Sequence, residues 1–590
     1  MTSRTNVHRE LANVRETFES IWVAIILAFV LRAFIIEAFV IPTGSMAPRL
    51  MGQHQLLDCP SCGYEFPFGV DSASAGSSRG ANTPAFCPNC SEKIDTAFAK
   101  APPQSGDRVL VLKYLYKFRQ PDRWDVVVFK NPQSNRDNYI KRLAGLPGEM
   151  VRIIHGDLFT AKVQDANGDG NLDDKDLDFN HDGVFTAEDL ETAQGQALQW
   201  QIARKTQQNQ EVMWQLLFDT DYQPNLRPRT DWKNPWQVRS GASEQWQLTA
   251  SEGRVFHYQG DAPATVDFAR DNSNVFLATN AYNSRQADGS VNHNTDICND
   301  LKLQTVLAPA SAAGTLKLSL TAFNDQFDAR IGFDGQLQLI RRRVDQAGKT
   351  LSVWQTRKTI PPLQVGRAVP VALTHVDWKV TLWIDGKPVL ETEDKDYAPD
   401  VPELVQLMHD TNTRLLTPSV SITGESGAFD LWHTRVMRDV FYTCPDLRNQ
   451  TMITVPPEVM SATPQQFTEW AGKPIPTDAD GKTLPSAAMP GWGTMDRPLL
   501  LRKYKDNQDL DEFFMLGDNS PASLDSRLWV KAAATLRLTD AQGNPQYRMG
   551  TVPRYNMMGK AFFVYWPAGH PLPGLRLPLV PNVGKMREIH

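Results

Sequence analysis

The stretch Ile41-Pro-Thr-Gly-Ser-Met-Ala-Pro-Arg-Leu50 places a serine hydroxyl a few residues after an apolar N-terminal segment. Two downstream stretches complete the pattern: Tyr139-Ile-Lys-Arg-Leu-Ala-Gly-Leu-Pro-Gly-Glu149 and Gly517-Asp-Asn-Ser-Pro-Ala-Ser-Leu-Asp-Ser-Arg527. A serine hydroxyl is a poor nucleophile until a neighbouring base takes its proton. No His-Asp pair occurs near these stretches, and Lys141 is the available base. The pattern therefore predicts a serine–lysine site.

A lysine can act as a base only when its amine is neutral, so burial in apolar surroundings must lower its pKa. Tyr139, Ile140 and Leu143 supply apolar neighbours in the sequence. Successive side chains of a strand point to opposite faces, so Lys141 and Arg142 should point in opposite directions. We expect one reactive cation and one structural cation.

The order and spelling of the three stretches resemble type I signal peptidases, the membrane-anchored proteases that remove signal peptides from exported proteins. The resemblance implies that Ser45 is the nucleophile and Lys141 the general base. It also implies that Ser523 orients the lysine, while Asp525 and Arg527 form a supporting ion pair. Cleavage is then expected after small residues of exported preproteins, with no cofactor needed for catalysis.

Two positions depart from the family pattern. The backbone N–H of Ser45 and a hydroxyl two residues earlier should donate hydrogen bonds to the oxyanion. Many members have Ser at that earlier position, and this chain has Thr43. Thr43 keeps the hydroxyl and adds a methyl group. Ser520 stands where Arg is common.

The N-terminal segment is the candidate membrane anchor. Trp22 to Ile41 has about the 20 residues that a bilayer requires, and Arg4, Arg9 and Arg15 precede it. A cleaved signal peptide is the alternative, but cleavage there would detach the anchor from Ser45. We expect a single-pass protein of the inner (cytoplasmic) membrane, in contact with lipid, with everything from Pro42 onward extracytoplasmic.

Composition sets limits on the rest of the chain. With 590 residues, two to four domains are expected. The net charge of −6 argues against nucleic acid as a partner, because nucleic-acid-binding proteins usually carry a basic excess. The 40 Pro, 37 Gly and 15 Trp suit β-rich domains joined by many turns.

Six cysteines form two groups. Cys59-Pro-Ser-Cys62 and Cys87-Pro-Asn-Cys90 match a four-cysteine structural zinc site of zinc-ribbon type, with disulfides or a redox pair as alternatives. Cys298 and Cys444 stand apart, and either a disulfide between them or free thiols remains open.

An acidic repeat follows, with the spacing of EF-type calcium loops. The expected calcium ligands are Asp165, Asn167, Asp169, Asp173 and Asp176 in the first loop, and Asp178, Asn180, Asp182 and Asp189 in the second. A solvated acidic turn is the alternative.

Short β-patterns recur from about 245 to 443, and Lys379–Thr392 reads as a hairpin with Asp385-Gly386 at its turn. By pattern this region resembles laminin-G or concanavalin-like jelly rolls, which leaves a glycan or protein contact open.

We therefore expect a mainly β fold: one transmembrane helix and a β-rich catalytic domain interrupted by a zinc-ribbon insertion and a jelly-roll-like β-sandwich. The expected boundaries are a cytoplasmic N-terminus at 1–19, the anchor at 20–41, catalytic parts at 42–58, 106–164 and 445–590, a zinc-ribbon-like insertion at 59–95, calcium loops at 165–191 and the sandwich insertion at 192–444. The alternative function is a non-catalytic, membrane-anchored adhesion or scaffold protein that binds through its inserted modules.

Overall fold

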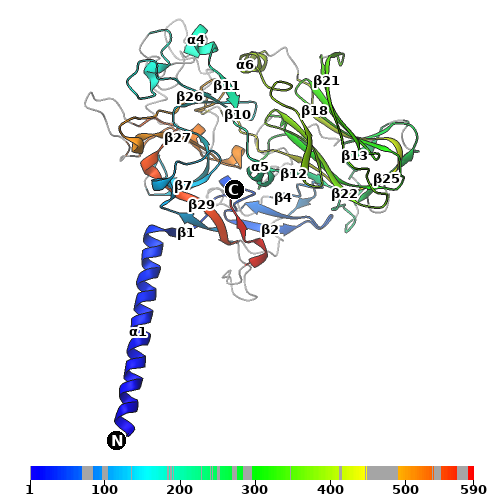
Figure 1. The fold of residues 1–590 in the computed structure, drawn as a ribbon. Coiled ribbons are helices and arrows are strands. Elements are labelled where there is room, and N and C mark those ends of the chain that lie inside the picture. The colour runs from blue at the N-terminus through cyan, green and yellow to red at the C-terminus, as the bar shows by residue number, and fades with distance from the viewer. Residues whose placement is uncertain are drawn as a thin grey trace.

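The structure of the chain is a computed structural model. It describes residues 2–69, 84–95, 104–134, 136–181, 185, 189–190, 192–227, 229–230, 232–239, 241, 244–248, 253–268, 275–282, 296–345, 347–410, 415–445, 447, 490–533, 536, 547–567 and 582–590. A long N-terminal helix projects from a β-rich body, and a large β-sandwich lies beside that body (Figure 1). The fold is mainly β, as the sequence predicts.

The N-terminal segment corrects one expectation. Helix α1 (Thr2–Phe34) ends before the predicted anchor does, and β1 (Ile36–Val40) follows as a strand. β1 pairs antiparallel with β6 (Arg108–Leu112), so Ile36 faces Leu112 and Val40 faces Arg108. The apolar run could not reveal this change, because the partner strand lies far away in the sequence. Within the described residues, no helix combines the length and apolar content needed to cross a membrane.

The eight-stranded sheet forms the body that carries the three motifs. Its strand order is β1-β6-β29-β7-β8-β27-β28, and β30 pairs with β29. The strands not yet given are β7 (Val126–Lys130), β8 (Asn138–Gly145), β27 (Glu512–Leu516), β28 (Val552–Pro553), β29 (Met557–Trp566) and β30 (Arg587–Glu588). Strands from both ends of the sequence are interleaved in this sheet, so the body is assembled from separate parts of the chain.

A four-stranded sheet joins this body in the order β11-β10-β9-β26. It contains β9 (Glu149–Ile154), β10 (Asp157–Lys162), β11 (Trp200–Ile202) and β26 (Leu499–Leu500). His155 and Gly156 form the turn between β9 and β10, and both residues adopt positive φ angles, 48° and 92°. β11 pairs with β10, so this part of the 192–444 region belongs to the four-stranded sheet and the sandwich strands begin at β12.

The cysteine region forms two small hairpins. β2 (His54–Asp58) pairs with β3 (Glu65–Gly69), and β4 (Ala85–Phe86) pairs with β5 (Lys93–Ile94).

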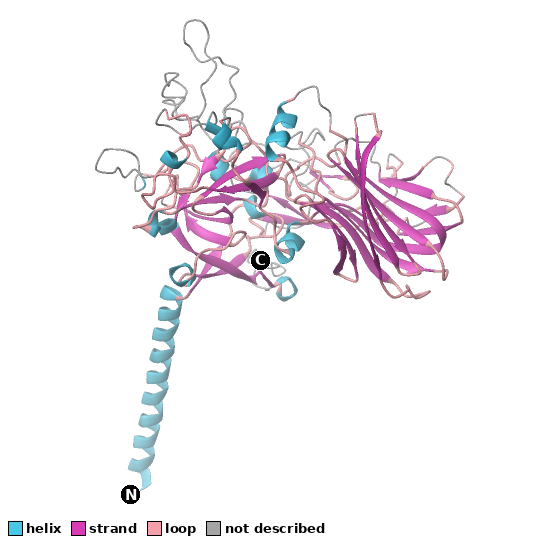
Figure 2. Ribbon diagram, turned by 45° about the horizontal axis from the view of Figure 1, so that its top comes forward, coloured by secondary structure: helices cyan, strands magenta, loops and turns pink. Residues whose placement is uncertain are grey.

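The insertion is a two-sheet sandwich (Figure 2). Both sheets include the long strand β25 (Ser419–Arg438). One part of β25 pairs with β16 and β18, and the other pairs with β12, β15 and β17. The strands are β12 (Gln215–Asp219), β13 (Trp236–Val238), β14 (Trp246–Leu248), β15 (Val255–Gly260), β16 (Ala264–Phe268), β17 (Leu301–Pro309), β18 (Thr315–Ala322), β19 (Asp325–Gly332), β20 (Gln336–Val344), β21 (Thr350–Thr359), β22 (Val369–Val376), β23 (Lys379–Ile384) and β24 (Lys387–Glu391).

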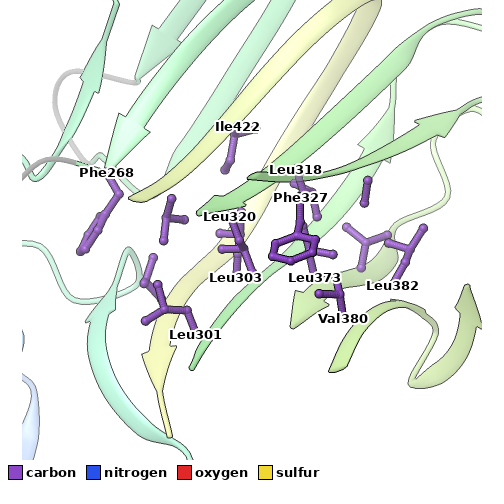
Figure 3. Packing of buried hydrophobic residues seen from close by; sticks show 14 of the residues in the cluster. Phe268, Leu301, Leu303, Leu318, Leu320, Phe327, Leu373, Val380, Leu382 and Ile422 are labelled. Carbon is purple, nitrogen blue, oxygen red and sulfur yellow. The ribbon is translucent and has the colours of Figure 1, made fainter. Parts of the chain in front are cut away.

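The sandwich core is built from alternating apolar side chains of both sheets. Leu318 and Ile422 from one sheet face Leu303 and Leu373 from the other (Figure 3). All four side chains are fully buried, and burial of apolar surface is the main stabilising term in such a core. The predicted Asp385-Gly386 turn joins β23 to β24 with φ angles of 51° and 71°, as a two-residue hairpin requires.

The described helices other than α1 are short. They are α3 (Leu115–Phe118), α4 (Ala193–Gln196), α5 (Gln207–Met213) and α6 (Val401–His409), with 3-10 turns η1 (Gly44–Met46), η3 (Asp174–Asp176), η6 (Gln508–Leu510), η7 (Ser520–Ala522), η8 (Ser526–Leu528), η10 (Arg554–Asn556) and η11 (Val583–Lys585).

Candidate active site

Ser45 and Lys141 meet in the body of the eight-stranded sheet. Ser45 lies on the 3-10 turn η1, after β1, and Lys141 lies near the middle of β8. Lys141 Nζ is 2.5 Å from Ser45 Oγ, within hydrogen-bond distance. The two residues are only 3% and 8% exposed, so water is largely excluded from the pair. The geometry is that of a hydroxyl beside an amine able to take its proton.

The surroundings of Lys141 favour the neutral amine. Burial, which is the largest cause, and the charge of Arg527 lower its pKa to about 8, although the carboxylates of Asp525 and Asp518 oppose the shift. The amine also lies 5.3 Å from the centre of the Tyr139 ring.

Arg142 points to the other side of β8, as expected from strand geometry. Its guanidinium forms a bidentate ion pair with Asp518, at 2.8 and 2.7 Å, and both side chains are buried. The sequence reasoning did not single out Asp518, although it lies in the third quoted stretch. This pair ties β8 to the segment that follows β27.

Asp525 and Arg527 form the ion pair that the resemblance implies. Arg527 Nε and Nη2 donate to the two carboxylate oxygens at 2.9 and 2.7 Å, and neither side chain is exposed. Asp525 also accepts a hydrogen bond from the Gly517 N–H. Arg527 donates to the hydroxyl of Ser520 at 2.7 Å, so a small residue at 520 leaves room for this guanidinium.

Ser523 is fully buried at the same place. Within the described residues its hydroxyl makes no hydrogen bond. A Cβ on residue 517 would collide with that hydroxyl, and it would lie 2.6 Å from the carbonyl oxygen of Ser45. Gly517 therefore allows Ser523 and the nucleophile turn to approach each other.

The backbone of the nucleophile turn is held by Asn519, another residue that the sequence reasoning did not single out. The Asn519 backbone N–H donates to the Ser45 carbonyl at 3.0 Å, and its side-chain Nδ2 donates to the Gly44 carbonyl at 3.1 Å. Thr43 is exposed next to this turn, and its side chain does not cap η1.

The four cysteines of the two hairpins converge. Their sulfur atoms all lie within 4.8 Å of one another, and the residues are almost completely buried. Cys59 Sγ is 3.5 Å from Cys90 Sγ, and Cys62 Sγ is 3.7 Å from Cys87 Sγ. A disulfide would need about 2.05 Å, whereas tetrahedral zinc–sulfur bonds of about 2.3 Å place sulfurs roughly 3.8 Å apart. The donor set is therefore compatible with zinc. Cys298 and Cys444 are free thiols.

The two acidic loops share one internal geometry. Asp176 accepts hydrogen bonds from the backbone N–H groups of Ala166 and Asn167, and Asp189 accepts them from Phe179 and Asn180 at the matching positions. Further oxygens that accept local backbone hydrogen bonds belong to Asp165, Asn167, Asp169 and Asp173. Asp178 lies in the described part of the chain, and Asp182 lies outside it.

Among the described residues, two groups of side chains lie close enough together to hold a metal ion: the four cysteines, and a second group of Asp157, Asp300 and Asp377. The described residues of the acidic loops are in neither group. This second group lies where β10 meets the sandwich. Lys205 pairs there with Asp377, and with Asp439 at 2.9 Å. We call these four carboxylates and Lys205 the seam cluster.

A buried hydroxyl–amine pair of this kind is the arrangement expected of a serine–lysine hydrolase. The family model described as signal peptidase, peptidase S26, matches residues 93–208 and 495–566, which together contain Lys141, Ser523, Asp525 and Arg527. Within the divided β body, the two matched segments are thus similar to the signal peptidase S26 family. Ser45 lies before the matched residues, and the fold brings it to them.

Signal peptidases from several bacteria are similar to parts of the chain. A probable signal peptidase I-2 of Synechocystis sp. is 38% identical over 71 residues, which cover 11% of this chain and 32% of that protein. Signal peptidase I of Buchnera aphidicola is 28% identical over 149 residues, covering 25% and 34%. Signal peptidase I of Rickettsia prowazekii is 24% identical over 187 residues, covering 32% and 53%. The chain thus spans about a third to a half of the length of these relatives.

Two solved structures are similar to part of the chain. The carbohydrate-binding module CBM66 of Bacillus subtilis is 6% identical, with a TM-score of 0.20, over 34% of this chain and 95% of that one. The laminarinase catalytic domain of Thermotoga maritima is 10% identical, with a TM-score of 0.23, over 38% and 98%. Similarity at this level identifies no ligand.

Proposed function

We propose that this protein is a signal peptidase that cleaves signal peptides from exported preproteins with Ser45 as nucleophile and Lys141 as general base. The observation that carries the proposal is the distance of 2.5 Å between Lys141 Nζ and Ser45 Oγ, inside a body with two segments similar to the signal peptidase S26 family. The lowered pKa of Lys141 adds support, because a base must be able to lose its proton near the working pH.

The reaction follows from this geometry. Lys141 Nζ takes the hydroxyl proton as Ser45 Oγ bonds to the scissile carbonyl carbon. The backbone N–H of Ser45 and the hydroxyl of the exposed Thr43 would donate hydrogen bonds to the resulting oxyanion. Lys141 then returns the proton to the leaving amine as the C–N bond breaks. A water molecule, deprotonated by Lys141, hydrolyses the ester on Ser45 and restores the free serine.

The supporting side chains hold this pair in place. The Asp525–Arg527 ion pair fixes the backbone at Gly517 through the Asp525 carboxylate. The Ser523 hydroxyl, which has no partner within the described residues, is available to orient the Lys141 amine. Pre-positioning of this kind reduces the reorganisation that the reaction requires.

Membrane anchoring is the second part of the proposal. Apolar side chains on α1 are exposed, including Trp22 at 61%, Val23 at 65% and Phe29 at 65%. A helix of 33 residues is about 50 Å long, against a hydrocarbon core of about 30 Å. We place α1 in the inner membrane, with the catalytic body outside the cytoplasm beside its lipid-inserted substrates.

The four-cysteine cluster would bind structural zinc, and the acidic loops would bind calcium. Zinc is supported by the sulfur spacing, and calcium by the repeated loop geometry. Metal analysis of the purified chain should find about one zinc, and disulfides among Cys59, Cys62, Cys87 and Cys90 in its place would overturn that assignment. The sandwich would supply a contact surface for a glycan or a protein.

The test is cleavage of a purified preprotein by the full-length chain in detergent micelles. One new N-terminus after a small residue is expected, and Ser45→Ala should abolish it. A wild-type chain that binds the preprotein without cutting it would instead support the adhesion or scaffold alternative.

A further inference from the structure

We propose that the sandwich insertion contributes positioning residues to the peptidase site, through Asn280, Ala281 and Tyr282. This inference rests on the proposed function. The segment lies in the connection between β16 and β17, far from Ser45 in the sequence. It nevertheless lies directly against the turn that carries the nucleophile.

Tyr282 packs on the glycine that precedes the nucleophile. A Cβ on residue 44 would collide with the Tyr282 ring, and so would a Cβ on residue 69 at the end of β3. The ring is therefore wedged between the nucleophile turn and the first cysteine hairpin. Its centre lies 6.2 Å from that of His54, and Tyr282 is 5% exposed. Gly44 is required here because any larger residue would displace the ring.

Hydrogen bonds to Asn519 make a second connection. Asn519 Oδ1 accepts from the Ala281 N–H at 2.9 Å, and Asn519 Nδ2 donates to Asn280 Oδ1 at 3.1 Å. The same Nδ2 donates to the Gly44 carbonyl, and the Asn519 backbone N–H donates to the Ser45 carbonyl. Asn519 thus transmits the position of the insertion to both peptide groups around the nucleophile.

The consequence is a fixed orientation for the Ser45 backbone. The two carbonyl groups that Asn519 holds determine where the Ser45 N–H points, and that N–H is the proposed oxyanion donor. A donor that is already oriented costs no reorganisation during the reaction, and small misplacements reduce the rate strongly. The insertion would therefore act on the rate of the chemical step, with substrate binding little affected.

The experiment compares Asn280→Ala and Tyr282→Ala with wild type in the full-length chain. Two substrates are used: a signal-peptide substrate and a small activated ester, p-nitrophenyl acetate, with the rate of Ser45→Ala subtracted. We expect kcat to fall about tenfold in each variant, with KM changed by less than about twofold, and the ester rate to fall by a similar factor. Tyr282→Phe should stay near wild type because it keeps the ring.

Tyr222→Ala is the matched control, because this insertion tyrosine packs on Tyr64 of the cysteine region and not on Gly44. It should leave kcat unchanged. If the variants lose peptide cleavage but keep ester hydrolysis, the segment contacts the peptide substrate and the positioning role is wrong. Unchanged kcat in folded Asn280→Ala, whose side chain is only half-buried, also overturns the inference. Both results leave the proposed function intact. The proposed function fails only if the wild-type chain does not cleave the signal-peptide substrate.

Discussion

The side chains of Lys141 and Lys205 are both buried, yet their surroundings drive them to opposite protonation states. Lys141 lies beside a neutral hydroxyl, and burial lowers its pKa to about 8. Lys205 is buried as well, and burial lowers the pKa of its amine. The carboxylates of Asp377 and Asp439 have the larger effect and hold that pKa well above the ordinary value. The nearest partner, and not burial alone, decides whether a buried lysine serves as a base or as a structural cation.

The largest effect expected from this comparison is the loss of activity in Lys141→Arg. A guanidinium does not deprotonate usefully in proteins, so cleavage should fall at least about 10⁴-fold although the charge is kept. Ser45→Ala/Lys141→Arg should be little worse than either single variant. Lys130→Arg, at the exposed end of β7, is the matched control. Near-normal cleavage by folded Lys141→Arg would eliminate the serine–lysine mechanism.

Replacing each lysine by Met should change stability in opposite directions. Lys205→Met leaves Asp377 and Asp439 without their cation, and removing one partner of a buried pair typically costs about 3–5 kcal/mol. Lys141→Met removes a buried amine whose folded pKa is lowered, so it should raise Tm at pH 7, where the charged form is penalised. Thermal unfolding of both variants tests the comparison, and a lower Tm for Lys141→Met would contradict it.

The pH dependence of cleavage should report Lys141 directly. With a pKa of about 8, only about 1% of the amine is neutral at pH 6, so kcat/KM there should be about a hundredfold below its alkaline plateau. The profile should rise with a slope of one between these limits. A rate that stays flat from pH 6 to 9 would show that another group is the base.

The smallest effect concerns Asp157 in the seam cluster. Burial, together with the carboxylates of Asp300, Asp377 and Asp439, raises its pKa well above the ordinary value, with Lys205 opposing. The folded state therefore holds a proton that the unfolded state releases, and stability falls as pH rises above the unfolded pKa of about 3.9. Asp157→Asn should raise Tm at pH 8 by about 2–4 °C. The gain should disappear near pH 4; a gain that persisted there would point to packing instead.

The sequence was sufficient for the parts of the site that are spelled in short motifs. Ser45, Lys141 and the Asp525–Arg527 pair could be named because each lies in a recognisable stretch, and Asp385-Gly386 because a two-residue turn is a local signal.

What could not be predicted depends on contacts between distant segments. The seam cluster gathers Asp157, Lys205, Asp300, Asp377 and Asp439 from loops and strand ends of three separate regions. Nothing near Tyr282 in the sequence indicates that its ring lies on Gly44. The strand at 36–40 was missed for the same reason, since an apolar run is compatible with a helix until its partner β6 is known.

The pairing of β12 with the end of β25 has a consequence for how the chain folds. Gln215 lies opposite Arg438, so the sandwich begins and ends at neighbouring points. Once folded, the sandwich acts as a short covalent link between the parts of the peptidase body that precede and follow it. The peptidase body then no longer pays most of the entropic cost of closing a long flexible loop. In refolding experiments, the fluorescence change of the buried sandwich tryptophans Trp236 and Trp246 should therefore precede recovery of cleavage. An insertion of this kind would let its host assemble at the rate of a much shorter chain.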